Sequence, residues 1–470
     1  MPPLQKAKRN KRKLNKTASA SVWYIGSNIL AKSISFLFTP IFTRLLSPSE
    51  YGTYSLYVSL MGIFTVLTTF QMSGNVIYRG FAKFDGERRA KFLSSAFGAQ
   101  CLTSGASFLI FALIGRKLSS ITSLDTGLTL ILIFQIFLSG TEGFFLAKCR
   151  YDGKYQTVAT LNIAVGILTP ILSLVLIHAG LGGYSRILSP LFISLAVSIP
   201  IAVAIFREGK RLVWGEGWRF LFKMTLPMLP HFISLSLIAQ SDKIIIARVL
   251  GEDTLGKYSA AYSIGFIISN LASAFTVALS PWIIRKMKAG KGEDVKSCII
   301  TTAKVICYGT LLFMAILPEL FFAAVAPEYR EALPVAYVAA LTVIFSFLSS
   351  AISICILHYE KPMLITKNSL TVALFAVPIG YLLTKKMGYI GGAIVSVGSH
   401  AFLFALNQLS IEKVGGDGTK VKFGLHLFGF SVFALMMFFL RISFFSRLLI
   451  SVALVLLAIP ELKACKKLLF

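Results

Sequence analysis

Apolar stretches of about 20 residues recur along this chain from Val22 to Pro460, separated by short basic or glycine-rich breaks. Each stretch is long enough to cross a ~30 Å hydrocarbon core as a helix. The chain is 56% apolar and 14% charged, whereas a soluble domain has roughly 45–50% apolar and about 25% charged residues. Because the breaks are too short to hold a soluble domain, the sequence predicts an all-α polytopic membrane protein.

The apolar segments indicate about 14 transmembrane helices, an even number that places both termini on one side of the membrane. The predicted spans are residues 22–42, 53–76, 92–114, 127–147, 157–178, 187–206, 225–248, 258–282, 298–322, 333–357, 368–384, 389–409, 423–440 and 448–461.

Lysine and arginine cluster in alternate breaks, which is the pattern of the positive-inside rule. With a cytoplasmic N-terminus, 33 of them fall on the inner side and 11 on the outer side. We therefore expect both termini to be cytoplasmic. The net charge of +27 is explained by topology, so nucleic acid is not an expected partner. The polybasic start, Lys6 to Lys16, is too charged to insert and is interpreted as a topology anchor.

A repeat runs through the chain. Five residues of the segment 44–55 recur 204 residues later, and four residues between 151 and 183 recur 208 residues later. The pairs are Arg44/Arg248, Leu46/Leu250, Gly52/Gly256, Tyr54/Tyr258, Ser55/Ser259, Tyr151/Tyr359, Pro170/Pro378, Gly180/Gly388 and Gly183/Gly391. Six predicted helices separate the copies, so the two halves have parallel topology. Transporters with such repeats bind substrate between the halves near the midplane.

This repeat predicts two pseudo-symmetric six-helix lobes plus two C-terminal helices. The predicted divisions are a basic cytoplasmic tail (1–20), an N-lobe (21–206), a cytoplasmic inter-lobe linker (207–224), a C-lobe (225–411) and a final segment with the last two helices and the C-terminal tail (412–470).

Motifs in both halves resemble those of polysaccharide transporters in the multidrug/oligosaccharidyl-lipid/polysaccharide exporter superfamily. The first is Asn28-x3-Lys32-x3-Phe36-x3-Pro40-x2-Thr43-Arg44-Leu45-Leu46-Ser47-Pro48-x-Glu50-Tyr51-Gly52-x-Tyr54. The second comprises Leu226-Pro227-x2-Pro230, Ser241-Asp242-Lys243, Leu250-Gly251 and Leu255-Gly256-x-Tyr258. The resemblance covers nearly the whole chain and is not specific to one sugar.

The resemblance implies a Wzx-type flippase of the bacterial cytoplasmic (inner) membrane with V-shaped lobes that alternate in access. Its substrate would be an oligosaccharide repeat unit linked to undecaprenyl pyrophosphate, destined for a surface polysaccharide such as O-antigen or capsule. The implied partners are the lipid-linked oligosaccharide and the polymerase and glycosyltransferases of the same pathway. We expect a monomer.

Lys32 is the leading candidate for substrate binding, because charges inside a membrane are costly and usually functional. It lies about 11 residues into the first predicted span and shares a helix face with Asn28. In a water-filled cavity, Lys32 and Asn28 could meet a pyrophosphate. The alternative is a structural ion pair between Lys32 and Glu142.

Four further polar residues lie within predicted spans. Glu142 and Asp242 are candidates for ion coupling with Na⁺ or H⁺ or for gating, although Glu142 could equally be a buried partner for a lysine. Lys243 and Gln240 share a face and are candidates for substrate binding. Lys243 could instead snorkel to the surface, and snorkelling is the favoured reading for Lys304.

Several classes of function are disfavoured. The sequence has no GxxxxGK[ST] motif, so we expect no ATP hydrolysis. It has no metal motif, no catalytic arrangement and no paired cysteines, so we expect neither an enzyme nor a cofactor. The outer breaks are too short for a membrane glycosyltransferase or polymerase. A cation or drug antiporter of the MATE type and a flippase of the peptidoglycan precursor remain alternatives, although the excess of lysines within spans favours an anionic substrate.

Overall fold

The computed structural model describes residues 26, 34, 37–415 and 444–469. These residues form helices and no strand, which confirms the all-α prediction. Among them, eight helical stretches are long and apolar enough to cross a membrane. Two of the eight, Tyr155–Gly209 and Gly215–Lys288, each contain two of the predicted spans. The predicted span 423–440 lies outside the described residues, as does most of the span 22–42.

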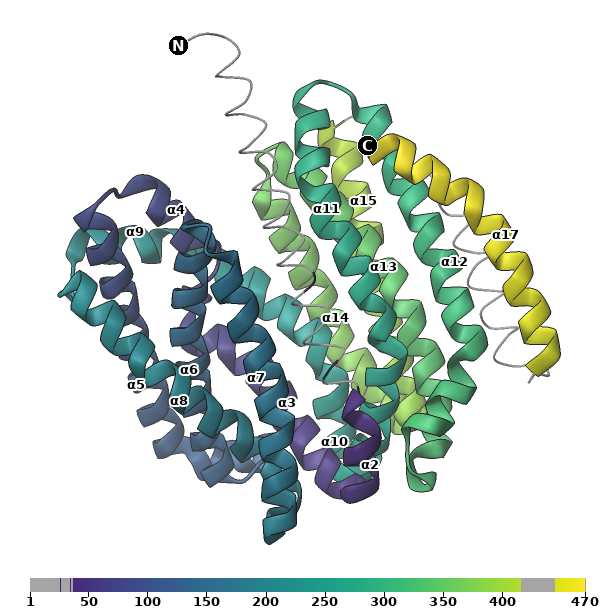
Figure 1. Cartoon of the computed structure of the whole chain (residues 1–470), viewed down its shortest axis with the longest axis horizontal. Coiled ribbons are helices and arrows are strands. Elements are labelled where there is room, and N and C mark those ends of the chain that lie inside the picture. Colours follow the sequence, from purple (N-terminus) through teal and green to yellow (C-terminus); the bar gives the residue numbers. More distant parts are fainter. Residues whose placement is uncertain (1–25, 27–33, 35–36, 416–443, 470) are drawn as a thin grey trace. The chain divides into compact units, whose positions relative to one another are not determined.

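The chain divides into two compact units (Figure 1). Unit 1 holds the described residues up to Leu45 together with Leu60–Leu229, and unit 2 holds Leu46–Ser59 together with the described residues from Pro230 onward. Helix α3 (Pro48–Thr69) contributes to both, because its first half belongs to unit 2 and its second half to unit 1.

The long helices of unit 1 form a bundle in which α5 packs against α6 and α8, and α7 packs against α8. The helices of this unit are α2 (Thr39–Leu45), α4 (Asn75–Lys83), α5 (Glu87–Thr122), α6 (Thr126–Tyr151), α7 (Tyr155–Leu176), η1 (Ile177–Leu181), η2 (Gly182–Tyr184), α8 (Ser185–Gly209), α9 (Gly215–Thr225) and η3 (Leu226–Met228). The turn between α7 and α8 contains Gly180, whose φ of 88° suits a residue without a Cβ.

Two short amphipathic helices, α4 and α9, lie at the same end of this bundle (Figure 1). Neither was predicted. The span predicted over 53–76 ends at Thr69, because Phe70 and Gln71 take left-handed backbone conformations with φ of 49° and 55°. The region predicted as a linker, 207–224, contains the ordered helix α9, which packs on α4 and α5 of unit 1.

Unit 2 is arranged around α13, which contacts α11, α12, α14 and α15 and is largely buried. Its helices are α10 (Leu229–Gly265), η4 (Phe266–Ile268), α11 (Ser269–Lys288), α12 (Gly292–Ala324), η5 (Pro327–Ala332), α13 (Leu333–His358), α14 (Pro362–Met387), α15 (Tyr389–Gly415) and α17 (Phe444–Leu469).

Helix α10 is two helical segments that meet at Gly251, whose φ of 86° and ψ of 170° are not helical. Such a φ favours glycine. The break matches the boundary predicted between the spans 225–248 and 258–282. It also allows residues before and after Gly251 to face each other.

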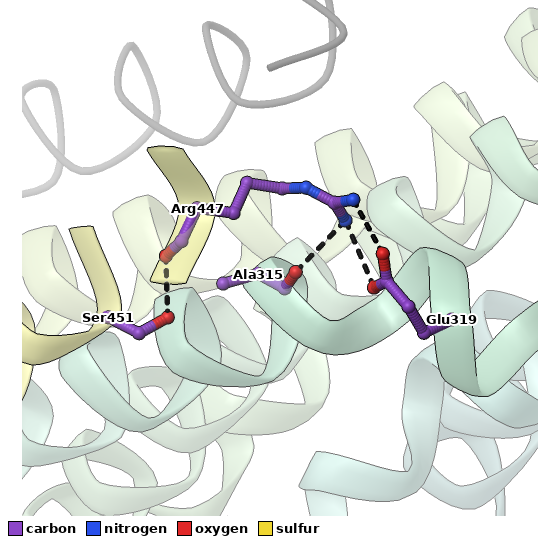
Figure 2. A network of polar contacts seen from close by, with 4 residues as sticks. All are labelled: Ala315, Glu319, Arg447 and Ser451. Carbon is purple, nitrogen blue, oxygen red and sulfur yellow. Dashed lines mark hydrogen bonds and ion pairs between the residues drawn. The ribbon is translucent and has the colours of Figure 1, made fainter. Parts of the chain in front are cut away.

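The C-terminal helix α17 packs along α12 and is joined to it by two ion pairs. Arg447 of α17 reaches Glu319 with both guanidinium nitrogens, at 2.6 and 3.1 Å, and also donates to the carbonyl oxygen of Ala315 (Figure 2). Lys304 of α12 pairs with Glu461 of α17 at 2.9 Å. The two pairs lie about four turns apart along each helix, so they fix the register of α17 on α12.

Candidate functional site

Asp242 forms the centre of a polar cluster in unit 2. Its side chain is only 4% exposed, and Oδ2 accepts a hydrogen bond of 2.5 Å from the hydroxyl of Tyr258. The break at Gly251 makes this contact possible, because Tyr258 lies in the second segment of α10 and Asp242 in the first. The other carboxylate oxygen, Oδ1, is buried and has no partner in the described part of the chain. A buried carboxylate with one open oxygen can accept a proton or a small cation.

Lys243 and Gln240 lie together in the same region. The lysine Nζ donates to Oε1 of Gln240 at 3.2 Å and lies 4.9 Å from the centre of the Tyr262 ring. Both side chains are half-buried. The amine is thus held by a hydrogen bond and a cation–π contact within unit 2. The predicted site residues Gln240, Asp242 and Lys243 are neighbours in the sequence, and the structure adds Tyr258 and Tyr262 to them.

Helix α15 completes this cluster with residues that the sequence analysis did not select. The Tyr262 hydroxyl lies 3.2 Å from Oγ of Ser396, and Nδ1 of His400 lies 2.8 Å from the Ser396 carbonyl oxygen. No sequence pattern around His400 marks it as part of a site, and it is its contact with Ser396 that connects it with the cluster. We call Gln240, Asp242, Lys243, Tyr258, Tyr262, Ser396 and His400 the α10–α15 cluster.

A second buried network joins α13, α14 and α15. Asn368 donates to Oδ1 of Asn407 at 3.0 Å and to Oγ of Ser410 at 2.8 Å. Asn407 in turn donates to Oγ of Ser349 and of Ser353, each at 3.1 Å. Both amide groups are buried and well bonded. Hydrogen bonds of this kind hold membrane helices together, so we assign the network a structural role.

Glu142 lies on α6 in unit 1, where two serines of α8 contact it. The Ser198 hydroxyl donates to Oε1 of Glu142 at 3.2 Å, and Ser194 supplies a second hydrogen bond. Within the described residues Glu142 makes no ion pair with lysine or arginine. Its predicted alternative partner, Lys32, lies outside the described residues, as does Asn28.

Lys304 pairs with Glu461 of α17, and its side chain is 28% exposed. That its amine extends towards the membrane surface stays a prediction. Among the described residues no group of three or more His, Cys, Asp or Glu side chains could hold a metal ion.

The repeated motif forms a close, reciprocal contact inside unit 2. A Cβ on Gly52 would lie 1.9 Å from the carbonyl oxygen of Glu252, and a Cβ on Gly256 would lie 1.8 Å from that of Pro48. Positions 52 and 48 correspond to 256 and 252 in the 204-residue repeat. The first half of α3 and the second segment of α10 therefore cross with local two-fold symmetry.

A polar contact accompanies this crossing. The Thr53 hydroxyl donates to a carboxylate oxygen of Glu252 at 2.5 Å. Tyr329 donates to the Leu46 carbonyl oxygen at 3.0 Å, and its ring packs edge-on against that of Tyr51.

The sequence is similar to those of a known protein family and of proteins with assigned names. A sequence profile of the family described as "Polysaccharide biosynthesis protein" matches residues 18–287. A relative in Haloferax volcanii, named "Probable low-salt glycan biosynthesis flippase Agl15", is 20% identical over 413 residues, covering 86% of this chain and 85% of the relative.

Solved structures with the same fold include two kinds of transporter. The structure titled "Lipid II flippase MurJ, inward closed conformation" superposes with a TM-score of 0.69 at 15% identity, over 94% of this chain and 98% of that one. An inward-facing multidrug resistance MATE family transporter of the MOP superfamily gives a TM-score of 0.59 at 14% identity, over 82% and 95% of the two chains. At these identities the likeness concerns the fold alone.

Proposed function

Because the chain belongs to the polysaccharide biosynthesis protein family, we propose that it is a flippase for oligosaccharide repeat units linked to undecaprenyl pyrophosphate. It moves these units across the bacterial cytoplasmic membrane for the synthesis of a surface polysaccharide. The observation that carries this proposal is the family match over residues 18–287, together with the transporter fold. The flippase name of the Haloferax volcanii relative supports it.

The proposed cargo sets a physical requirement that the polar residues could meet. A sugar–pyrophosphate head must cross a ~30 Å apolar core, and a charge there needs water or a counter-charge. Lys32, Asn28, Lys243 and Gln240 are proposed to bind the head during alternating access. A lysine amine is a compact charge that can follow a moving phosphate more freely than a bidentate arginine can.

Glu142 and Asp242 are proposed to couple transport to an ion gradient or to gate it. Both are carboxylates in predicted spans with hydroxyl neighbours: Ser198 beside Glu142 and Tyr258 beside Asp242. Protonation or binding of Na⁺ at either carboxylate would change the balance of charge that the substrate meets. In this proposal the polymerase and glycosyltransferases of the pathway act on either side of the transport step, and both termini of a monomeric transporter are cytoplasmic.

A peptidoglycan-precursor flippase shares the chemistry of the lipid pyrophosphate, and a MATE-type antiporter shares the fold. The antiporter would select cations. The amine of Lys243 within the α10–α15 cluster favours an anionic cargo instead.

Flipping by the purified chain in proteoliposomes tests the proposal. Lipid-linked repeat units are loaded in one leaflet, and their arrival in the other is followed by accessibility to an added glycosidase. We expect transport by the wild-type chain. For Lys243→Gln we expect the transport rate to fall by about tenfold or more, because the charged hydrogen bond between the Lys243 amine and the pyrophosphate is lost. The control is Lys367→Gln, an exposed lysine of α14. Transport of a cationic dye but not of the lipid-linked glycan would overturn the proposal.

A further inference from the structure

Helices α4 and α9 form an amphipathic pair whose apolar faces are anchored on α5. In α4, Gly80 packs so closely that a Cβ would lie 2.0 Å from the Phe92 ring. In α9, the indole nitrogen of Trp218 donates to the Ser95 carbonyl oxygen at 2.7 Å, and Leu221 is fully buried. The apolar faces of both helices are thus covered by the protein, and their other faces are left exposed.

The opposite faces of the two helices carry four exposed cations. Each helix presents two of them one turn apart, Arg79 and Lys83 on α4 and Arg219 and Lys223 on α9. We call these four residues the basic cradle.

The two basic pairs lie beside each other because the helices run antiparallel. A guanidinium nitrogen of Arg79 lies 3.7 Å from the sulfur of Met224 near the end of α9. The amine of Lys83 lies 4.7 Å from the centre of the Phe220 ring near its middle. Lys83 is therefore placed near Arg219, and Arg79 near Lys223.

The acidic residues in the segments that carry the cradle are already engaged by other cations. Glu216 pairs with Arg88 at 2.7 Å, Asp85 with Arg89 at 3.3 Å and Glu87 with Lys91 at 3.4 Å. Glu208 pairs with Lys148. Within the described residues none of the four cradle cations has a carboxylate partner, so their positive charge is available to an outside anion.

We propose that the basic cradle binds cardiolipin from the surrounding leaflet. Its two phosphodiester groups match the two neighbouring basic pairs, and basic clusters at this level of a membrane protein recognise such head groups. Both helices lie at one end of a bundle whose long helices are apolar enough to cross a membrane, and this position brings the cations to the level of the lipid phosphates. Phe84 and Phe220, which stack under Lys83, hold its amine at this surface. The cradle belongs to unit 1 and shares no residue with the α10–α15 cluster of unit 2, and it does not depend on the identity of the transported glycan.

Lipid binding to the purified full-length chain in detergent tests this inference, with tetraoleoyl cardiolipin titrated and bound lipid counted by native mass spectrometry. Each basic residue near a lipid surface contributes about fivefold to affinity. We therefore expect Arg79→Gln/Lys83→Gln and Arg219→Gln/Lys223→Gln each to bind cardiolipin roughly twentyfold more weakly. The matched control is Lys385→Gln/Lys386→Gln, which removes the same charge from two exposed lysines at the end of α14; its cardiolipin affinity should fall clearly less than that of either cradle variant.

Three results would overturn the inference. If both double variants bind cardiolipin as tightly as the wild type does, the cradle is not a cardiolipin site. If the control variant loses as much affinity as they do, the binding depends only on the net charge of the protein. The third is a loss of undecaprenyl diphosphate binding in the cradle variants with cardiolipin binding intact, which would assign the cradle to the transported lipid instead. Monodispersity and helical content of each variant establish that it has folded.

Discussion

Gly52 and Gly256 occupy equivalent positions in a helix crossing that repeats its own contact. Each glycine faces the carbonyl oxygen of the residue four positions before the other, Glu252 for Gly52 and Pro48 for Gly256. Absence of a Cβ lets the two backbones touch, as in other small-residue crossings of membrane helices. The same internal repeat that is visible in the sequence thus appears as a symmetric contact in space.

Alanine at either glycine should separate the two helices. A Cβ at 1.8 or 1.9 Å from a carbonyl oxygen cannot be accommodated without backbone movement, and overpacking of this kind costs about 1–3 kcal/mol. We expect Gly52→Ala and Gly256→Ala to lower the Tm of the purified chain by several degrees. Gly105→Ala in α5 is the control, because a Cβ there would meet open space. A Tm equal to that of the control would show that the crossing is not tight.

We expect the pairs Arg447–Glu319 and Lys304–Glu461 to stabilise the packing of α17 on α12. In a double-mutant cycle of Arg447→Gln and Glu319→Gln, we expect a coupling energy of about 0.5–1 kcal/mol, because Glu319 is 44% exposed and solvent screens the pair. Thermal unfolding of the four proteins in detergent measures this coupling. Additive effects of the two substitutions would contradict a direct interaction.

Asp242→Asn and Tyr258→Phe should have different effects: the first should change the ion dependence of transport, and the second should lower the stability of the protein. Asp242→Asn keeps an oxygen that can accept from Tyr258, so the variant should fold while its transport loses dependence on Na⁺ or H⁺. Tyr258→Phe leaves a buried carboxylate without its donor, which should cost about 1–3 kcal/mol.

Unfolding and ion-dependent transport of these variants are measured together. Tyr308→Phe is the control, because Tyr308 is half-buried and its hydroxyl makes no hydrogen bond within the described part of the chain. If transport by Asp242→Asn depends on Na⁺ or H⁺ as strongly as transport by the wild-type chain does, Asp242 has no role in ion coupling.

The sequence predicted the long helices well because lipid imposes a length and an apolar composition on each of them. It did not predict α4, since the apolar run continues past Thr69 and neither Phe70 nor Gln71 belongs to a residue type that marks a left-handed turn. Helix α9 was missed for the opposite reason: its basic residues read as a linker, and its apolar face is evident only from the α5 surface that it covers.

The same limit applies to the candidate site. Gln240, Asp242 and Lys243 could be selected because charged and polar residues are rare within apolar segments. The roles of Tyr258 and His400 depend on tertiary contacts, the first across the Gly251 break and the second through Ser396 of α15. A lone tyrosine or histidine in a helix carries no sign of such a partner in its local sequence.

The charge bias predicts that α4 is cytoplasmic and that the turn between α7 and α8 is external. Ala82 and Tyr184 are both exposed in the structure, so Ala82→Cys and Tyr184→Cys are matched reporters. A membrane-impermeant maleimide added to intact cells should label Tyr184→Cys and leave Ala82→Cys at the level of the wild-type chain. Labelling of Ala82→Cys alone would reverse the orientation.

Lys32 provides the most direct test of the proposed transport chemistry, although it lies outside the described residues. A lysine in an apolar span needs water, a counter-charge or loss of its proton. If it binds the pyrophosphate in a water-filled cavity, Lys32→Ala should accumulate in the membrane at wild-type levels but fail to complement a flippase-null strain. Lys32→Arg should retain part of the activity because it keeps the charge, and Lys32→Glu should retain none.

The alternative for Lys32 is a structural pair with Glu142, and a double substitution separates the two roles. In a structural pair, Lys32→Ala leaves an uncompensated carboxylate, which is strongly destabilising, so the single variant should accumulate poorly and Glu142→Gln should restore its level. In a substrate site, Glu142→Gln cannot restore export, because the cation that meets the pyrophosphate is still missing. The hydroxyls of Ser194 and Ser198 already contact Glu142, and they could hydrogen-bond a glutamine equally well. The double variant should therefore fold, and its export alone decides between the two roles: recovery would identify a structural pair, and continued failure at normal protein levels would support substrate binding by Lys32.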